Sequence, residues 1–165
     1  MADLNYMKNI YRLFIVVFAI CVLCGCREKI ERLREQIAIE GVESTKGSPM
    51  SGLTIGLRVR NDSSYTVTIP SASVQLYYMD NYICTAELDE TALIPKRYNG
   101  SVSVKVKLDM PNPLKGLIII RQLSKGDYSG FTCTLDAKVK IGVASRRLRL
   151  ENIPLTEMLK KLGVK

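Results

Sequence analysis

The stretch LTIGLRVRN, residues 53 to 61, decides the fold because apolar and polar side chains alternate along it. Every second residue from Leu53 to Val59 is aliphatic, and the residues between them are Thr54, Gly56 and Arg58. A period of two places the aliphatic side chains on one face of a β-strand and the others on the opposite face. One buried face and one wet face are typical of antiparallel sheets.

The same alternation recurs downstream and predicts further strands. These stretches are YTVTI (65–69), SVQLYYMD (73–80), YICTAEL (82–88), SVSVKVKL (101–108), FTCTLDAKVKI (131–141) and RRLRL (146–150). We therefore expect an immunoglobulin- or fibronectin-III-like antiparallel β-sandwich of about seven to eight strands. A short C-terminal helix is expected in LTEMLKKLGVK (155–165). Residues 114–123 fit a short helix, but 117–120 fit a buried strand equally well, and periodicity does not decide between them.

The N-terminal segment has the organisation of an export signal. Lys8 and Arg12 precede an uninterrupted apolar run of eleven residues from Leu13 to Leu23. A helix that spans a bilayer needs about 20 apolar residues, so this run fits the short core of a secretory signal peptide instead. Translation can begin at Met1 or at Met7, and the sequence leaves this open.

The end of the apolar run carries three of the five cysteines in the chain. Leu23-Cys24-Gly25-Cys26 resembles the lipobox of bacterial lipoproteins, which is an aliphatic residue, a small residue, Gly and an obligatory Cys. The resemblance implies cleavage before Cys26 and acylation of that residue, including palmitate, so that it anchors the chain in a membrane of the cell envelope. Arg27 follows the anchor, where Asp would favour the inner membrane, and therefore favours the outer membrane.

The chain is thereby divided into three parts. Residues 1–25 form the signal peptide, 26–52 the lipidated cysteine and a tether, and 53–165 the β-sandwich domain. Helical spacing of apolar residues between Ile30 and Ile37 predicts a short helical stalk in the tether. The segment GVESTKGSPMSG (41–52) is rich in Gly and Ser and predicts a loop, although a first strand can begin as early as residue 36.

The sandwich region resembles the late embryogenesis abundant type 2 domain, which is related to the water-stress-hypersensitive domain and also occurs in bacterial lipoproteins. Its pattern is a strand that ends in Asn, a polar turn, a second strand, a hairpin, and an Ile-Pro step before a strand of alternating valines. Asn61, Ile69 and Ile94-Pro95 match this pattern here. The resemblance implies a small β-sandwich without a catalytic site and a role in stress protection, protein interaction or contact with lipids.

Cationic side chains on the outward faces of the predicted strands are the best candidates for binding. The chain has 24 Lys and Arg against 16 Asp and Glu. If several of these cations share a face, they form a positive surface for anionic lipid or glycan. The candidates are Arg58, Arg60, Lys105, Lys107, Lys138, Lys140, Arg147 and Arg149. The alternative is an ordinary solvated face whose lysines protect strand edges.

Cys84 and Cys133 are both expected on the apolar side of their strands. An exported compartment permits a disulfide between them, and two separate buried thiols are the alternative. Sequence spacing does not show whether their Cα atoms lie within bridging range.

The absence of histidine narrows the function. The chain contains no His, which excludes Ser–His and Cys–His nucleophile pairs and His-containing zinc sites. We expect no enzymatic activity, no metal and no cofactor, and export makes nucleic acid an unsuitable partner. The sequence thus predicts a lipid-anchored structural, interaction or stress-protective module of the cell envelope. A carrier of apolar ligands or lipids and a pilus or adhesin subunit remain open alternatives.

Overall fold

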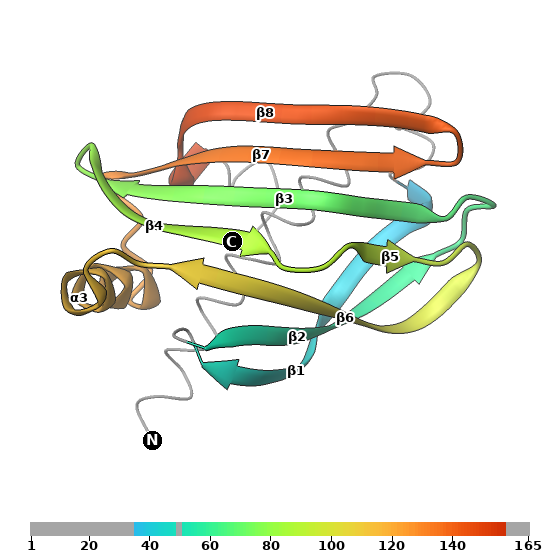
Figure 1. Ribbon diagram of the computed structural model, residues 1–165, viewed down its shortest axis with the longest axis horizontal. Coiled ribbons are helices and arrows are strands. Elements are labelled where there is room, and N and C mark those ends of the chain that lie inside the picture. The colour runs from blue at the N-terminus through green and yellow to red at the C-terminus, as the bar shows by residue number, and fades with distance from the viewer. Residues whose placement is uncertain (1–34, 49–50, 158–165) are drawn as a thin grey trace.

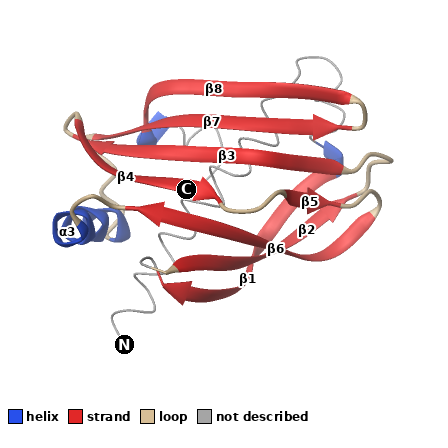
Figure 2. Cartoon of the chain, in the orientation of Figure 1, coloured by secondary structure: helices blue, strands red, loops and turns tan. Residues whose placement is uncertain are grey.

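The computed structural model of the protein describes residues 35–48 and 51–157. The predicted signal peptide, the lipobox and residues 26–34 and 49–50 of the predicted tether lie outside this range. Eight strands and the helix α3 follow one another along the described chain, which also has helical residues at 35–36 and 155–157 (Figure 2). They are β1 (Ile37–Ser48), β2 (Gly52–Asn61), β3 (Val67–Tyr78), β4 (Asn81–Leu88), β5 (Ala92–Ile94), β6 (Tyr98–Asp109), α3 (Pro113–Ser124), β7 (Phe131–Ile141) and β8 (Ala144–Pro154).

The strands form one antiparallel sheet in the order β1-β2-β6-β4-β3-β7-β8, and β5 pairs with β3 beside β4. β1 and β2 run obliquely to β3, β7 and β8, so that the sheet curls into two layers (Figure 1). The prediction of a mainly β, antiparallel fold with about eight strands is confirmed. The layers are parts of one hydrogen-bonded sheet and not two separate sheets, because the end of β6 pairs with β4 while its beginning pairs with β2.

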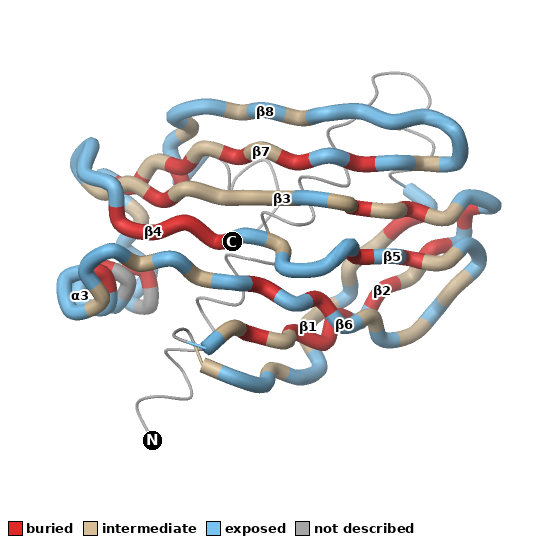
Figure 3. Tube along the Cα trace, in the orientation of Figure 1, coloured by how far each residue is buried: buried red, intermediate tan, exposed pale blue. Residues whose placement is uncertain are grey.

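Two clusters of apolar side chains fill the interior. The first lies between β3, β4, β7 and α3 and includes Leu76, Ile119, Phe131 and Leu135. The second joins the two layers, because Ile55 and Val104 from β2 and β6 pack with residues of β3, β5 and β7. Figure 3 shows that β4 is buried along much of its length, whereas β8, at one edge of the sheet, is mostly exposed.

The sequence interpretation of residues 41–52 as a loop is wrong for Gly41–Ser48. These residues continue β1, which pairs with β2 from Ile37 to Ser48. β1 is an edge strand with one hydrogen-bonded neighbour, and the register shifts at Ile39/Gly41 and Val42/Ser44. Bulges and half-exposed side chains interrupt the period of two, which is why the pattern failed there. Within the predicted helical stalk, the structure describes residues 35–36 as helical.

Two further differences concern proline and a short strand. The stretches predicted separately at 65–69 and 73–80 are one strand, β3, which continues through Pro70. The pairing of β3 with β7 shifts between Thr68 and Ser71. Proline cannot donate to the ladder, so it is tolerated at such an irregularity. The three residues of β5 are too few to show a period.

Residues 113–124 form helix α3 and not a strand, which decides the alternative that the sequence left open. Asn112 caps the helix, because its Oδ1 accepts a hydrogen bond of 3.1 Å from the Lys115 N–H. Pro113 follows at the start, where a missing N–H costs nothing. Ile119 and Leu123 are buried against the first cluster. At the end of the chain, residues 155–157 are helical, and the rest of the predicted C-terminal helix lies outside the described residues.

A buried asparagine organises the end of the sheet where the described chain begins. The Asn61 side chain is 0% exposed, and its Nδ2 donates hydrogen bonds of 2.9 Å to the carbonyls of Tyr65 and Pro95. Its Oδ1 accepts bonds from the N–H and the hydroxyl of Ser63. Beside it, the Asp62 N–H donates to the Gln36 carbonyl. One amide therefore ties together the β2–β3 loop and the β5–β6 turn.

Candidate functional site

The eight cations proposed as an anionic-surface site fall into two groups. Arg58 and Arg60 on β2 and Lys105 and Lys107 on β6 form the first group, and the second group lies on β7 and β8. β4 and β3 separate the two groups in the order of the sheet. The eight side chains therefore do not form one continuous positive face.

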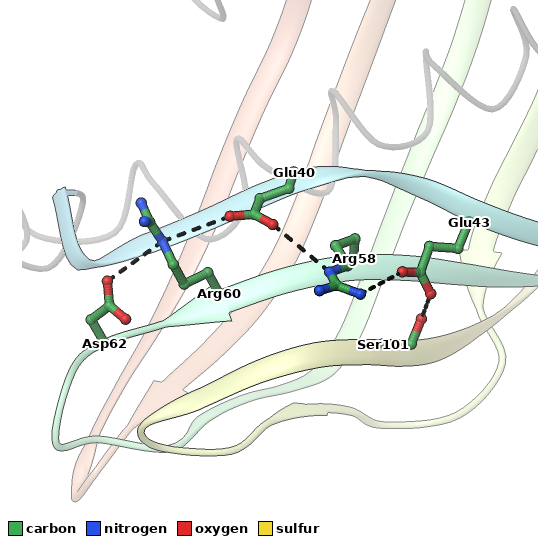
Figure 4. A network of polar contacts seen from close by, with 6 residues as sticks. All are labelled: Glu40, Glu43, Arg58, Arg60, Asp62 and Ser101. Carbon is green, nitrogen blue, oxygen red and sulfur yellow. Dashed lines mark hydrogen bonds and ion pairs between the residues drawn. The ribbon is translucent and has the colours of Figure 1, made fainter.

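The arginines of β2 are paired with carboxylates of the neighbouring edge strand (Figure 4). Arg58 lies 3.1 Å from Glu43 and 3.9 Å from Glu40. Arg60 Nε lies 3.8 Å from Glu40 and 3.4 Å from Asp62. Hydrogen bonds from Ser101 and then from Arg58 lower the pKa of Glu43, so this carboxyl is ionised at neutral pH. The first two candidates thus sit in a network of alternating charge.

The lysines of β6 are paired with the acidic segment that follows β4. Lys105 Nζ lies 2.6 Å from Glu90, and Lys107 Nζ lies 2.5 Å from Asp89. These carboxylates raise the pKa of both lysines, since each hydrogen bond favours the charged ammonium. All four side chains are at least partly exposed, and exposed pairs of this kind contribute little to stability. Their effect is to neutralise the positive potential of this face.

The second group is only partly neutralised. Arg147 binds Asp136 through two hydrogen bonds of 2.8 and 2.6 Å, which lower the pKa of that carboxyl, and Arg149 lies 2.7 Å from Glu151. Lys138 faces Arg147 across the β7–β8 ladder, and Lys140 faces Ser145. Within residues 35–48 and 51–157, neither of these two lysines forms an ion pair. Of the eight candidates, Lys138 and Lys140 are therefore the cations available to an external anion.

Cys84 and Cys133 are buried, as predicted, and are not disulfide-bonded in the structure. The sheet explains why, because Leu76 of β3 pairs with Cys84 on one side and with Cys133 on the other. The Cα atoms of the two cysteines are therefore two strand spacings of about 4.8 Å apart. This separation exceeds the Cα distance of about 7 Å that a disulfide allows. The Cys133 thiol contacts the Ile153 carbonyl at 3.6 Å. Of the two alternatives that the sequence left open, the structure therefore has two separate buried thiols.

Burial of these thiols makes the stability of the fold depend on pH in the alkaline range. Desolvation raises the pKa of Cys84 and of Cys133 to about 12, against about 8.5 in an unfolded chain. Above pH 8.5 the unfolded state releases these protons and the folded state keeps them, so stability falls as pH rises towards 12. Each thiol contributes a slope that approaches about 1.4 kcal/mol per pH unit. Urea unfolding at several pH values measures this slope.

The variant that isolates the effect is Cys84→Ala combined with Cys133→Ala. We expect its stability to fall less steeply above pH 9 than that of the unmodified chain. At pH 7 the thiols are protonated in both states, so a difference there reports packing alone. Identical slopes for the two proteins above pH 9 would contradict buried neutral thiols.

The turns beside the entry of the chain carry residues that the strand pattern did not indicate. We define the entry end as Gln36, the loop 61–66, the turn 95–97 and the turn 142–143. Hydrogen bonds join these segments, because Arg97 N–H donates to Ser63 O and Lys96 N–H to Thr66 Oγ1. Val67 pairs with Ile141, which brings the β7–β8 turn to the same end. Turn residues do not follow the alternating pattern, so the sequence did not indicate that these turns lie at the same end of the sheet.

Among residues 35–48 and 51–157, no group of three or more His, Cys, Asp or Glu side chains is arranged to hold a metal ion. In the same part of the chain, no helix combines the length and the apolar character that crossing a bilayer requires.

Comparisons with known proteins add little. No protein-family model matches the chain, and no curated protein matches it. A solved structure described as a protein from Archaeoglobus fulgidus is similar over 67% of this chain and 91% of that chain, with 9% sequence identity and a TM-score of 0.41. A likeness at that level carries no argument about function.

Proposed function

We propose that the protein is a lipid-anchored, non-enzymatic module of the bacterial cell envelope, acylated at Cys26 and located in the outer membrane. The observation that carries the proposal is Leu23-Cys24-Gly25-Cys26, placed directly after a cationic start and a short apolar run. Each buried methylene contributes about 0.8 kcal/mol to membrane binding, so several acyl chains anchor a protein nearly irreversibly.

The folded part of the chain from β1 to β8, which we call the β body, supports a structural or interaction role beyond the anchor. Ten residues, 27–36, separate Cys26 from the start of β1, which leaves a short tether. β1 and β8 are the two ends of the sheet order, and unpaired backbone groups on edge strands can pair with an extended segment of another chain. Within the resemblance to the late embryogenesis abundant type 2 domain, Asn61 and Pro95 are joined by a hydrogen bond. Through this contact, two residues of the family pattern together hold the β2–β3 loop against the β5–β6 turn.

The experiment that tests the proposal is analysis of the protein purified from cells. We expect a mature chain that begins at Cys26, carries the mass of a diacylglyceryl group and an acyl chain, and sediments with outer membranes. The protein should stay with membranes in high salt and enter solution in detergent. A mature N-terminus without acyl mass, or a chain that salt alone removes, would refute the anchor.

The sorting part of the proposal has its own prediction. Arg27→Asp should move the protein from outer to inner membranes while leaving acylation unchanged, because Asp directly after the anchor favours retention. Glu28→Asp places the same residue one position later and is the matched control, which should remain in the outer membrane. Density-gradient separation of the two membranes measures the distribution. An unchanged distribution for Arg27→Asp would remove the outer-membrane assignment and leave the anchor intact.

A further inference from the structure

The entry end exposes two apolar side chains, one on the loop 61–66 and one on the turn 142–143. The Tyr65 ring is 52% exposed and Val143 is 108% exposed, at the tip of a two-residue hairpin turn. Gly142 precedes Val143 with φ +59°, and a Cβ built on it would lie 3.3 Å from the Tyr65 ring. The ring and the turn are therefore neighbours. Single exposed apolar residues are ordinary, but a valine fully exposed beside an aromatic ring is a small apolar tip.

Three cations lie on segments that adjoin this tip. Lys96 and Arg97 lie on the turn that is hydrogen-bonded to the loop 61–66, and Lys140 lies two residues before the hairpin glycine. All three are exposed, and none forms an ion pair with the residues that the structure describes. The carboxylate of Asp62 at the same end forms an ion pair with Arg60. Exposed apolar side chains with cations on adjoining segments suit the interface of an anionic bilayer, where rings and aliphatic groups enter and ammonium groups meet phosphates.

The chain outside the structure brings this end to a membrane. Eight residues, 27–34, separate Cys26 from the first described residue, and eight residues span at most about 30 Å. As a helix they would span about 12 Å. The described chain enters beside loop 61–66, because Gln36 is hydrogen-bonded to Asp62. The acylated residue therefore holds the entry end closest to the bilayer.

A second exposed apolar surface lies at the opposite end. Leu114 and Ile118 of α3 are 77% and 68% exposed and share one side of the helix. α3 lies at the far end of the strands from the turn 142–143 (Figure 1). A 12-residue strand such as β3 is about 40 Å long, so the tether does not favour this end. It is the rival surface that an experiment has to distinguish.

We propose that the entry end is a docking surface for an anionic lipid bilayer. Tyr65 and Val143 enter the headgroup region, and Lys96, Arg97 and Lys140 contact lipid phosphates. The β body then stands on the membrane with α3 directed away from it. This inference rests on the anchor at Cys26 proposed above.

The absence of tryptophan makes the orientation measurable. The chain contains no Trp, so one introduced residue supplies the only indole signal. Val143→Trp places it at the entry end, and Leu114→Trp places it on α3 as the matched control. Both positions are exposed, so neither change disturbs the core. The acylated full chain is reconstituted into vesicles of anionic and zwitterionic phospholipid, with or without brominated acyl chains that quench indole emission.

The expected result is quenching and a blue shift for Trp at 143 and neither for Trp at 114. Quenching of the 114 variant alone would overturn the orientation in favour of α3. If acyl mass is present and neither variant is quenched, the body stands off the bilayer and only this inference fails. If acyl mass is absent and neither protein associates with vesicles, the anchor fails as well, and the mass measurement distinguishes the two failures.

The cationic part of the surface has a charge-matched test in the Val143→Trp background. Lys96→Gln with Lys140→Gln removes two cations at the entry end, and Lys115→Gln with Lys125→Gln removes two at α3. We expect the first pair to reduce quenching in anionic vesicles and to weaken its salt dependence, because Arg97 alone remains and salt screens exposed charges beyond about 10 Å at 0.1 M. The second pair should leave quenching unchanged. Equal effects of the two pairs would show a dependence on net charge alone and overturn the assigned contacts.

Discussion

Replacement of Cys26 by serine is expected to abolish incorporation of radioactive palmitate and to release the protein from the membrane fraction. Serine has nearly the same size as cysteine but offers no thiolate, which is the group that attacks the lipid donor. The effect is all-or-none, because no other residue supplies the same bond.

The neighbouring cysteines provide matched controls for this experiment. Cys24→Ser keeps a small residue at the second lipobox position, and Cys21→Ser changes a thiol inside the apolar run. Both variants should retain palmitate label and membrane association. If Cys26→Ser still carries label, or if Cys24→Ser loses it to the same extent, the identification of Cys26 as the acylated residue is wrong.

Asn61→Asp is expected to destabilise the β body by about 4 kcal/mol at pH 7. The change is isosteric but converts an amide donor into an oxygen that faces the carbonyls of Tyr65 and Pro95. The Pro95 carbonyl loses this donor, which costs about 1–3 kcal/mol, while the Tyr65 carbonyl keeps a hydrogen bond of 3.1 Å from the Ser63 hydroxyl. A carboxylate in a site with 0% exposure adds a desolvation penalty. Urea unfolding followed by circular dichroism measures the loss.

The pH dependence of the Asn61→Asp variant identifies the cause. Burial raises the pKa of the new carboxyl in the folded state above its unfolded value of about 3.9. Below pH 3.9 the acid is neutral in both states and its deficit is smallest. The deficit then grows by up to about 1.4 kcal/mol per pH unit until the folded pKa is reached. A loss that does not vary with pH would contradict a buried, ionising group.

Asn81→Asp is the control for burial. The Asn81 Nδ2 also donates a 2.9 Å hydrogen bond to a backbone carbonyl, that of Met79, but the pair is exposed. Water replaces the lost donor there, so we expect a change of less than about 1 kcal/mol. Equal losses at positions 61 and 81 would mean that the hydrogen bond itself, and not its buried surroundings, determines the effect.

Local alternation predicted most of the sheet because burial of one face imposes a period of two. Leu53 to Val59 and Phe131 to Val139 follow that rule, and their apolar residues are buried as expected. The rule failed for β1, whose edge position requires only one partner strand and tolerates Gly41 and two bulges. It also failed at Pro70, where a residue typical of a break lies inside a continuous strand.

The candidate site was predicted less well, because ion pairs depend on register and not on local pattern. The outward direction of Arg58 and Lys105 follows from alternation, but their partners Glu43 and Glu90 each lie 15 residues away along the chain. For the thiols, the sequence gave the correct face of each strand. Their separation depends on β3 lying between β4 and β7, which only the order of the sheet reveals.

The passage of β6 from one layer to the other has a consequence for how the protein comes apart. Its first residues complete the ladder of β2 and its last residues complete that of β4, while Ala72 of β3 and Leu108 of β6 contact both apolar clusters. Neither half retains a closed interior once the other is lost, so melting is cooperative across the whole body. A protease therefore finds no stable half to cleave separately, and we expect degradation of the molecule to proceed in one step.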